Sequence, residues 1–451
     1  MDKNYENLDE FNRINLYRPS AKSPLTTFLN KKLQESELKR MKKFSSLLEA
    51  FHLKNTITTD VSGRNIIING KQVKNFSSAN YLGFDQHPEV IKAAVNGLER
   101  FGNHSGCSRI FSSHSNIVKL EVEVAKLVGA QKSLICANVS QIHAGAIPAL
   151  FSGEDFEIFI DHYAHTSLYQ ASLIAKAKGT LISKVDVEHL KELKNKLSLS
   201  CRSTKILLID GLYSMQGNMP EILEIQKICD ETNTILYIDD AHGIGIYGHN
   251  GGGVAELLNL SFNNMILVGS LQKGLGAFGA FIAGAETLID ILRVSSKSYI
   301  FSGTLQPQAV DGALAAIAIS ASDEGRKLRE ELYQKSKYIR KSLLELNYNV
   351  LDPHGNSPII SVEMGSDLRT LMAGKTIFDS GVYLNSVMFP AVPKNKGLLR
   401  ISLNSVHSDD DIEVLLSAFK FLSIELNNNL NHLTENFSYF VRIMKSKIQI
   451  Q

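Results

Sequence analysis

Short apolar segments alternate with helical stretches through the middle of this chain, and this alternation restricts the possible fold more than any other feature. Helical patterns such as Val187–Leu197 and Glu221–Glu231 separate the apolar segments. The segments with the length and composition of buried strands are Ser133–Cys136, Phe156–Ile160, Ile206–Ile209, Ile235–Ile238 and Met265–Val268. Parallel strands that are covered on both faces need such wholly apolar runs. The sequence therefore predicts an α/β protein with a large, doubly wound, mostly parallel sheet.

The chain has 451 residues, enough for two domains, and its texture divides it into four parts. Residues 1–75 read as a polar helical arm followed by a hairpin with an Asn-Gly turn. We expect residues 76–306 to form the large cofactor-binding domain and residues 307–426 a smaller C-terminal α/β domain. The strands expected in the smaller domain are Ile359–Glu363 and Leu398–Leu403.

Residues 427–451 form a tail that begins with an Asn-rich link and continues into Phe437–Lys445. A disordered or self-packed tail is the favoured interpretation. The alternative is an amphipathic helix that lies on a membrane surface or on a partner.

Composition excludes several classes of protein. The net charge of +2 gives no field for nucleic acid, and no apolar run is long enough to span a membrane. The cysteines show no CxxC or Cys/His metal spacing and fit reduced thiols; they are Cys107, Cys136, Cys201 and Cys229. We therefore expect a cytoplasmic protein without a metal site.

One lysine stands at the end of a predicted strand. Ser270-Leu271-Gln272-Lys273-Gly274 follows Met265–Val268, so Lys273 comes three residues after a hydroxyl and next to glycine. A lysine in this place could form a Schiff base, with the hydroxyl on a phosphate and the glycines close to a flat cofactor. Taken alone, a solvated surface charge is the favoured interpretation of Lys273.

An acid and a histidine follow the preceding predicted strand. Ile235–Ile238 runs into Asp239-Asp240-Ala241-His242-Gly243. Ligands in open α/β sheets bind at the carboxyl ends of the strands, where Asp239 and His242 would lie. Each residue alone reads as a capping acid or a loop histidine. Together with Ser270 and Lys273 they provide what pyridoxal phosphate (PLP) needs: a carboxylate at the ring nitrogen, a donor at the ring oxygen and an imine-forming lysine.

Further motifs follow one another in a characteristic order. They are Ser78–Phe84, Ser105–Arg109, Asp161–Ser167, Gly211–Gly217, Phe301–Pro307 and Leu399–Ser402. With Lys273, Asp239 and His242, this series resembles the fold-type I PLP enzymes over about residues 75–422. More narrowly, it resembles the α-oxoamine synthases, which join an amino acid to an acyl-CoA, usually with loss of carbon dioxide. The resemblance implies an aminotransferase-like fold.

The resemblance also implies roles for individual residues. His165 would stack on the cofactor ring, Ser214 would bond the ring oxygen, Ser270 would bind the phosphate and Arg400 would hold the substrate carboxylate. Asp239 and His242 would act with Lys273 and His165 in catalysis. Ser302 or Thr304 would reach the phosphate of the partner subunit in a homodimer with shared active sites.

The sequence departs from the family pattern at the phosphate site. A Ser-Gly-aromatic turn is usual there, but this chain has Asn138-Val139-Ser140-Gln141 without glycine. Backbone N–H groups and the Ser140 hydroxyl could still bind the phosphate. His104 stands where a small residue is usual, and the stretch after Arg109 is one residue short. Both departures fall near the expected substrate pocket.

Two segments resemble one subgroup of the family. Phe159–Leu168 and Lys394–Ser405 are similar to the bacterial synthases of α-hydroxyketone quorum-sensing signals, and Ser270-Leu271 fits them too. The loop at 105–109 fits the wider family better.

The resemblance thus implies a PLP-dependent acyltransferase that condenses an α-amino acid with an acyl-CoA to give an α-aminoketone. In that reaction Lys273 would take the Cα proton while Asp239 keeps the ring nitrogen protonated. One alternative is a PLP-dependent aminotransferase on the same fold. Another is a non-catalytic regulatory or scaffold subunit, against which the presence of Lys273, Asp239 and His242 argues.

Overall fold

The computed structural model describes residues 23–429, apart from 36–37, 40–41, 43–44, 47, 50, 55 and 63. Residues up to Ile57 and residues from Thr58 onward form two compact units. In the first unit, α2 (Pro24–Gln34) begins at Ser23, whose side chain accepts a hydrogen bond from Thr26 N. This helix agrees with the predicted helical arm. The predicted membrane-surface or partner helix of the tail lies outside the described residues.

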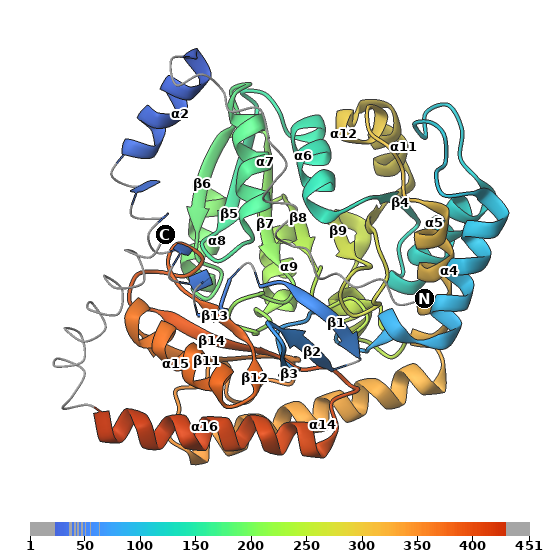
Figure 1. Ribbon diagram of the computed structural model, residues 1–451. Helices are drawn as coiled ribbons and strands as arrows, with labels where there is room; N and C mark the ends of the chain where they lie inside the picture. The colour runs from blue at the N-terminus through green and yellow to red at the C-terminus, as the bar shows by residue number, and fades with distance from the viewer. Residues whose placement is uncertain are drawn as a thin grey trace. The chain divides into compact units, whose positions relative to one another are not determined.

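A seven-stranded sheet forms the centre of the second unit (Figure 1). Its strands are β4 (Lys132–Cys136), β5 (Phe156–Asp161), β6 (Leu181–Val185), β7 (Thr204–Asp210), β8 (Thr234–Asp239), β9 (Met265–Ser270) and β10 (Ala280–Gly284). Their order is β4-β10-β9-β8-β7-β5-β6. All neighbouring pairs are parallel except those that β10 makes with β4 and β9. The predicted mostly parallel sheet is confirmed.

Helices cover both faces of this sheet, as a doubly wound fold requires. Along β7 and β8 the side chains alternate between two buried clusters, because successive strand residues point to opposite faces. One cluster packs under α5 (Ser115–Val128), α8 (Leu190–Leu199) and α9 (Ile222–Glu231). The other packs under α6 (Val139–Leu150), α7 (Thr166–Lys176) and α11 (Glu286–Ser295).

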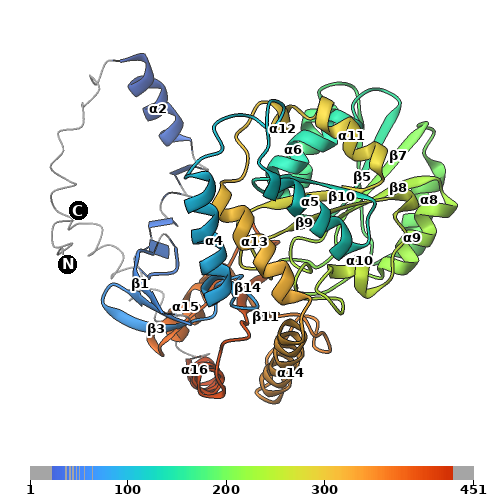
Figure 2. The same cartoon turned by 90° about the vertical axis from the view of Figure 1, so that its right-hand side faces the viewer.

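Two neighbouring helices lie against each other beside the sheet. Figure 2 shows α4 (Pro88–Phe101) next to α13 (Pro307–Ser320), and the two are in contact along their length. Gly97 of α4 permits this approach, since a Cβ there would lie 2.8 Å from Pro307 O. The remaining short elements are η1 (Phe84–Gln86), α10 (Gly253–Leu257), η2 (Phe262–Asn264) and α12 (Lys297–Ile300).

Strands of the C-terminal part lie in two smaller sheets, one of which they share with strands from residues 58–75. One has the antiparallel order β11-β14-β13, with β11 (Ile359–Gly365), β13 (Asn385–Val387) and β14 (Gly397–Ser402). The other has the order β1-β2-β3-β12, with β1 (Thr58–Ser62), β2 (Asn65–Ile68), β3 (Lys71–Asn75) and β12 (Val382–Tyr383). The helices of this part are α14 (Asp323–Glu345), α15 (Asp367–Asp379) and α16 (Asp409–Asn429).

The predicted hairpin forms as β2 and β3. Asn69 and Gly70 have φ angles of 50° and 76°, the left-handed conformation that an Asn-Gly hairpin turn needs. Because β3 pairs with β12, the hairpin shares a sheet with a strand from the C-terminal part. The predicted boundaries of the domains at 1–75, 76–306 and 307–426 remain predictions.

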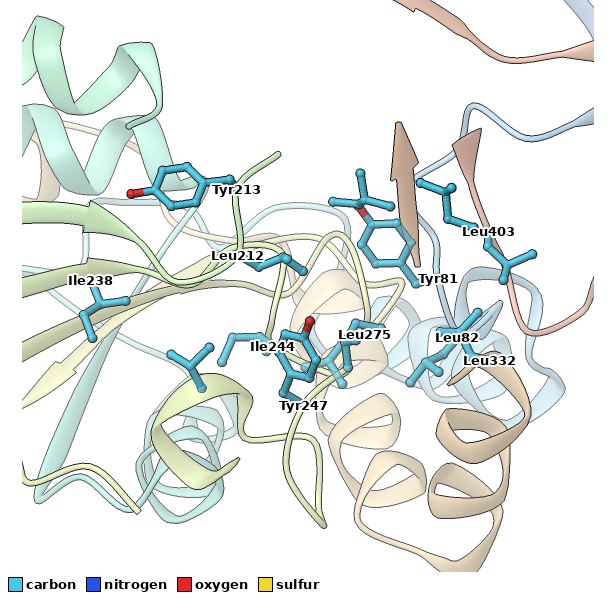
Figure 3. Close-up of a cluster of buried hydrophobic side chains, with 14 of the residues drawn as sticks. Tyr81, Leu82, Leu212, Tyr213, Ile238, Ile244, Tyr247, Leu275, Leu332 and Leu403 are labelled. Atoms are coloured by element: carbon cyan, nitrogen blue, oxygen red, sulfur yellow. The ribbon is translucent and has the colours of Figure 1, made fainter. Parts of the chain in front are cut away.

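A buried cluster joins the C-terminal part to the large sheet (Figure 3). Ile238 comes from β8, Ile244 and Leu275 come from the loops that follow β8 and β9, and Leu403 follows β14. Tyr81 lies among them and is fully buried. No helix in the described part of the chain is long and apolar enough to cross a membrane.

Candidate functional site

Polar residues end the parallel strands at one edge of the large sheet. Asp161, Asp210, Asp239 and Ser270 are the last residues of β5, β7, β8 and β9. A cavity of about 200 Å³ lies at this edge. The predicted cofactor residues that line it are Ser140, His165, Ser214, Asp239, His242, Ser270 and Lys273. The structure therefore brings together residues that are as much as 133 positions apart in the sequence.

Asp239 is buried at the inner end of the site and holds two hydrogen bonds. His143 Nε2 lies 2.9 Å from Asp239 Oδ2, and Ala241 N donates to Oδ1 at 3.0 Å. Burial alone would raise the pKa of Asp239, but the hydrogen bond and charge of His143 outweigh it, so the pKa lies below its ordinary value. Asp239 is therefore a carboxylate able to pair with a protonated ring nitrogen.

His143 was not predicted to belong to the site. It lies inside α6 and is fully buried, with Nδ1 2.9 Å from the hydroxyl of Tyr237. Its sequence context, Ser140-Gln141-Ile142-His143-Ala144, reads as an ordinary helix interior. Only the packing of α6 over β8 places it against Asp239.

Asp210 is a second acid that the sequence analysis missed. It lies opposite Asp239 in the register of β7 and β8, and its Oδ1 accepts a hydrogen bond from His165 N at 3.1 Å. Burial, and then the charge of Asp239, raises the pKa of Asp210 well above its ordinary value. The two neighbouring carboxyl groups thus have pKa values shifted in opposite directions, lowered for Asp239 and raised for Asp210.

Lys273 follows β9 and lies in the same cavity. Burial lowers the pKa of its amine to about 8, although the charges of Asp239 and Asp210 act in the opposite direction. The loops that carry Lys273 and His242 touch, because a Cβ at Gly274 would lie 2.3 Å from Ile244 O. The lysine is a partly dehydrated nucleophile, which differs from the surface charge favoured when it is considered alone.

His165 caps the N-terminus of α7, where its Nδ1 accepts from Ser167 N and lies 2.7 Å from Ser167 Oγ. Burial lowers the pKa of this imidazole, so it is neutral at neutral pH. A neutral ring held by its own helix cap is suited to stacking on a flat cofactor.

Arg400, on β14, is held by hydrogen bonds next to the cavity. Its Nε donates to Ser214 O at 2.6 Å, and its Nη1 donates to Ser402 Oγ at 2.9 Å. Its Nη2 lies 3.4 Å from the hydroxyl oxygen of Tyr81, which in turn lies 2.7 Å from His242 Nδ1. A guanidinium fixed in this way suits a carboxylate.

The segment without the usual glycine forms the N-terminus of α6. Asn138 caps the helix by accepting from Gln141 N at 2.8 Å, and Val139 and Ser140 line the cavity in the first turn. The first N–H groups of a helix lack partners within it and attract anions. A helix N-terminus together with the hydroxyls of Ser140 and Ser270 can bind a phosphate without the glycine turn.

Thr304 does not lie in this cavity within one chain. It lines a separate pocket of about 520 Å³ together with Phe278 and Leu305, and its buried hydroxyl has no hydrogen-bond partner among the described residues. Ser302 Oγ accepts a hydrogen bond from Gln141 Nε2 at 2.5 Å, close to the start of α6.

These groups fit PLP, as judged by their chemistry. The cavity offers a buried carboxylate for the ring nitrogen, a neutral imidazole for the ring face and an amine with a lowered pKa. It also offers a helix N-terminus and hydroxyls for a phosphate. Cofactors of this kind need all of these partners within one site.

Comparison with known proteins agrees with this geometry. Residues 71–419 match the family Aminotransferase class I and II. The 8-amino-7-oxononanoate synthase of Thermoanaerobacter pseudethanolicus is 30% identical over 377 residues, which cover 82% of this chain and 93% of that protein. The serine palmitoyltransferase of Sphingobacterium spiritivorum is 31% identical over 366 residues, which cover 80% and 90%.

Solved structures share the fold. A serine palmitoyltransferase from Sphingomonas wittichii has a TM-score of 0.81 at 23% identity, covering 87% of this chain and 98% of its own. A structure of SPT with PLP also has a TM-score of 0.81 at 23% identity, covering 88% and 99%. The chain belongs to the aminotransferase class I and II family, and within it to the α-oxoamine synthases, PLP-dependent enzymes of fold type I.

Proposed function

We propose that this protein condenses an α-amino acid with an acyl-CoA to give an α-aminoketone, free CoA and carbon dioxide. The observation that carries the proposal is the single cavity in which Lys273, Asp239, His165 and His242 meet the N-terminus of α6. The two curated relatives, one named for serine and a palmitoyl group and one for an amino-oxo acid, support this class of reaction.

In this proposal each site residue would contact a different part of the cofactor. PLP, when bound, supplies an electrophilic carbonyl carbon and a protonated ring that withdraws electrons from the amino acid's Cα. Asp239 would hold the ring nitrogen, and His165 would lie on the ring face. The N-terminus of α6, with Ser140 and Ser270, would hold the phosphate, while Ser214 and His242 would serve the ring oxygen.

Lys273 has two tasks in this proposal. Its amine would hold the cofactor covalently and, once the substrate's amine has replaced it, would take the proton from Cα. A pKa of about 8 favours both tasks, because a sizeable fraction of the amine is unprotonated near neutral pH. A lysine with its ordinary pKa would be almost entirely protonated there.

Arg400 would hold the carboxylate of the amino acid. The hydrogen bonds to Ser214 O and Ser402 Oγ fix the guanidinium plane before any substrate binds. Such preorganisation lowers the entropic cost of binding a planar anion by two parallel hydrogen bonds.

We further propose a cytoplasmic homodimer in which Thr304 serves the partner subunit's site. The unpartnered hydroxyl of Thr304 supports this, as do the exposed side chains of Phe301 (81%) and Phe278 (53%) on loops beside its pocket. Phe111, 83% exposed, is another large apolar side chain that a partner would cover. The four cysteines, none of them in a disulfide, fit a reducing compartment. The quorum-signal subgroup remains a prediction that rests on Phe159–Leu168 and Lys394–Ser405.

The test is an assay of thiol release with a panel of acyl-CoAs and amino acids, followed by mass spectrometry of the products. We expect CoA release that depends on both substrates, and a ketone whose mass reflects the loss of carbon dioxide. Lys273→Ala provides the inactive control. Formation of pyridoxamine phosphate without thiol release would instead identify an aminotransferase and overturn the proposal.

A further inference from the structure

Tyr81 is a buried tyrosine that the reaction described above does not use. Its side chain is fully buried, and burial raises the pKa of its phenol, so the hydroxyl keeps its proton at neutral pH. Among the described residues its oxygen contacts two polar groups, His242 Nδ1 at 2.7 Å and Arg400 Nη2 at 3.4 Å. Tyr81 therefore links the residue proposed for the ring oxygen to the residue proposed for the substrate carboxylate.

The directions of these two hydrogen bonds follow from what each group can do. A guanidinium can only donate, so the Tyr81 oxygen accepts from Arg400. The phenolic proton then needs an acceptor, and His242 Nδ1 is the acceptor within reach. If Nδ1 carried a proton instead, the hydroxyl proton of Tyr81 would be buried without a hydrogen-bond partner, which is unfavourable.

We infer that Tyr81 is a positioning residue: by donating to Nδ1 it holds His242 in the tautomer that carries its proton on Nε2. His242 lines the cavity, and Nε2 has no hydrogen-bond partner among the described residues. The imidazole thus presents an N–H donor to whatever oxygen lies there. This inference rests on the proposed function for its link to catalysis, because that oxygen would belong to the cofactor ring.

The surroundings of His242 keep it neutral, which a tautomer needs. Burial, followed by the positive charges of Lys273 and Arg400, lowers the pKa of His242 well below its ordinary value. The other charged or titratable neighbour that acts on it is His165. A neutral imidazole has one donor and one acceptor, so fixing the acceptor at Nδ1 fixes the donor at Nε2.

The backbone holds Tyr81 in place for this role. Ser405 N donates to Tyr81 O at 2.8 Å, and Asn404 Nδ2 donates to the carbonyl of Asn80 at 2.5 Å. Both donors lie just beyond β14, the strand that carries Arg400. The backbone of Tyr81 and the side chain of Arg400 are therefore held by one stretch of the chain, β14 and the residues that follow it.

The inference is tested by ¹⁵N NMR of the full-length chain with labelled histidine, before and after addition of PLP. The His242→Phe spectrum assigns the His242 signals. In the wild-type protein we expect a proton on Nε2 and none on Nδ1. In Tyr81→Phe both tautomers should be populated, and PLP should bind roughly threefold to tenfold more weakly, the effect of losing one neutral hydrogen bond. Tyr213→Phe is the matched control, since Tyr213 is a buried tyrosine whose hydroxyl donates to Asp161.

A proton on Nδ1 in the wild-type protein would overturn the inference, as would an unchanged single tautomer in Tyr81→Phe. If Tyr81→Phe does not fold, the wild-type spectrum alone decides. The tautomer can be read without turnover, so this test is separate from that of the proposed function. A protein with the expected tautomer that releases no CoA would contradict the function and leave the role of Tyr81 intact.

Discussion

Two acids that are neighbours across β7 and β8 have pKa values shifted in opposite directions, and the difference lies in the groups around each carboxyl. Asp239 accepts the hydrogen bond of His143 and its pKa is lowered, whereas Asp210 accepts one backbone N–H and burial raises its pKa. Two buried carboxylates this close would repel each other. The arrangement favours the negative charge on Asp239, which lines the same cavity as Lys273.

The lowered pKa of Lys273 predicts that this residue destabilises the cofactor-free fold. Lys273→Met removes the amine and keeps the length of the side chain, so we expect the free energy of unfolding at pH 7 to rise by on the order of 1–3 kcal/mol. Between pH 8 and about 10.5 the unfolded lysine still holds a proton that the folded one has lost, so wild-type stability rises with pH there.

Urea unfolding of both cofactor-free proteins at pH 7 and pH 9.5 measures this. The difference between variant and wild type should shrink at the higher pH. Equal stabilities at pH 7, or a difference that grows with pH, would show that Lys273 is not held in an environment that opposes its charge.

For single residues, the sequence predicts those site residues whose neighbours in the chain form a recognisable pattern. Lys273 and Asp239 each end an apolar run, and a strand end at a parallel sheet is where ligands bind. His143 gave no such signal, and Tyr81 lies in the motif Ser78–Phe84 but received no role of its own. His143 looks like a core residue of α6, and Tyr81 lies 161 positions before His242, so only packing reveals their contacts.

Among the elements, α6 has the clearest local task. Its N-terminus replaces the glycine turn expected at the phosphate, and Asn138 closes the first turn by its hydrogen bond to Gln141 N. The positive end of the helix dipole adds to the effect of the free N–H groups.

The substitution Asn138→Asp distinguishes the role of residue 138 as a helix cap from the role of the α6 N-terminus in binding phosphate. Aspartate caps a helix as well as asparagine does, and its charge favours the helix N-terminus, so we expect the Tm of the cofactor-free protein to stay the same or rise. The same charge repels a phosphate, and PLP should bind roughly tenfold more weakly.

Asn138→Ser keeps a cap without adding charge and serves as the control for both measurements. Thermal unfolding and equilibrium titration with PLP read the two effects. If Asn138→Asp bound PLP as tightly as Asn138→Ser, the N-terminus of α6 would not be the phosphate site.

The elements that escaped sequence analysis have weak patterns. β6 (Leu181–Val185) is an edge strand with mostly half-exposed residues, so it lacks the apolar run of its neighbours. β10 (Ala280–Gly284) follows a glycine-rich loop and contains two alanines and a glycine, which do not favour a strand by propensity. The strand is stabilised by its pairing with both β4 and β9, and not by its local sequence.

Across the whole second unit, Asp411 joins segments from its two ends. Its buried carboxylate pairs with Lys74 of β3 at 2.7 Å and with Arg64, in the turn between β1 and β2. It also accepts a hydrogen bond from Ser408 N, just before α16. Burial alone would raise the pKa of Asp411, but the hydrogen bond from Lys74 and the other donors lower it.

Asp411→Asn should lower the free energy of unfolding at pH 7 by about 2 kcal/mol, because two cations lose a buried partner but can still reach water. The folded pKa lies below the unfolded one, so the contribution is complete above about pH 4 and is lost as pH falls through the folded pKa. Unfolding measured at pH 7 and pH 3 should show a difference in free energy between variant and wild type that is smaller at the lower pH. If the difference in free energy of unfolding did not change with pH, the charge of Asp411 would not contribute to stability.

At the scale of the molecule, the order of strands and helices predicted the doubly wound sheet, because each unit of strand and crossover is local in sequence. The joining of β3 to β12 could not be predicted in the same way. It pairs Lys74 with Val382, and neither segment carries a pattern that selects the other.

The central claim is that Lys273 holds PLP in the cavity at the ends of β7, β8 and β9. The most direct measurement is reduction of the protein with borohydride after addition of PLP, followed by peptide mass spectrometry. The account predicts a pyridoxyl phosphate group on the peptide that contains Lys273 and none in Lys273→Met. A group found on another lysine, or on no lysine, would contradict it.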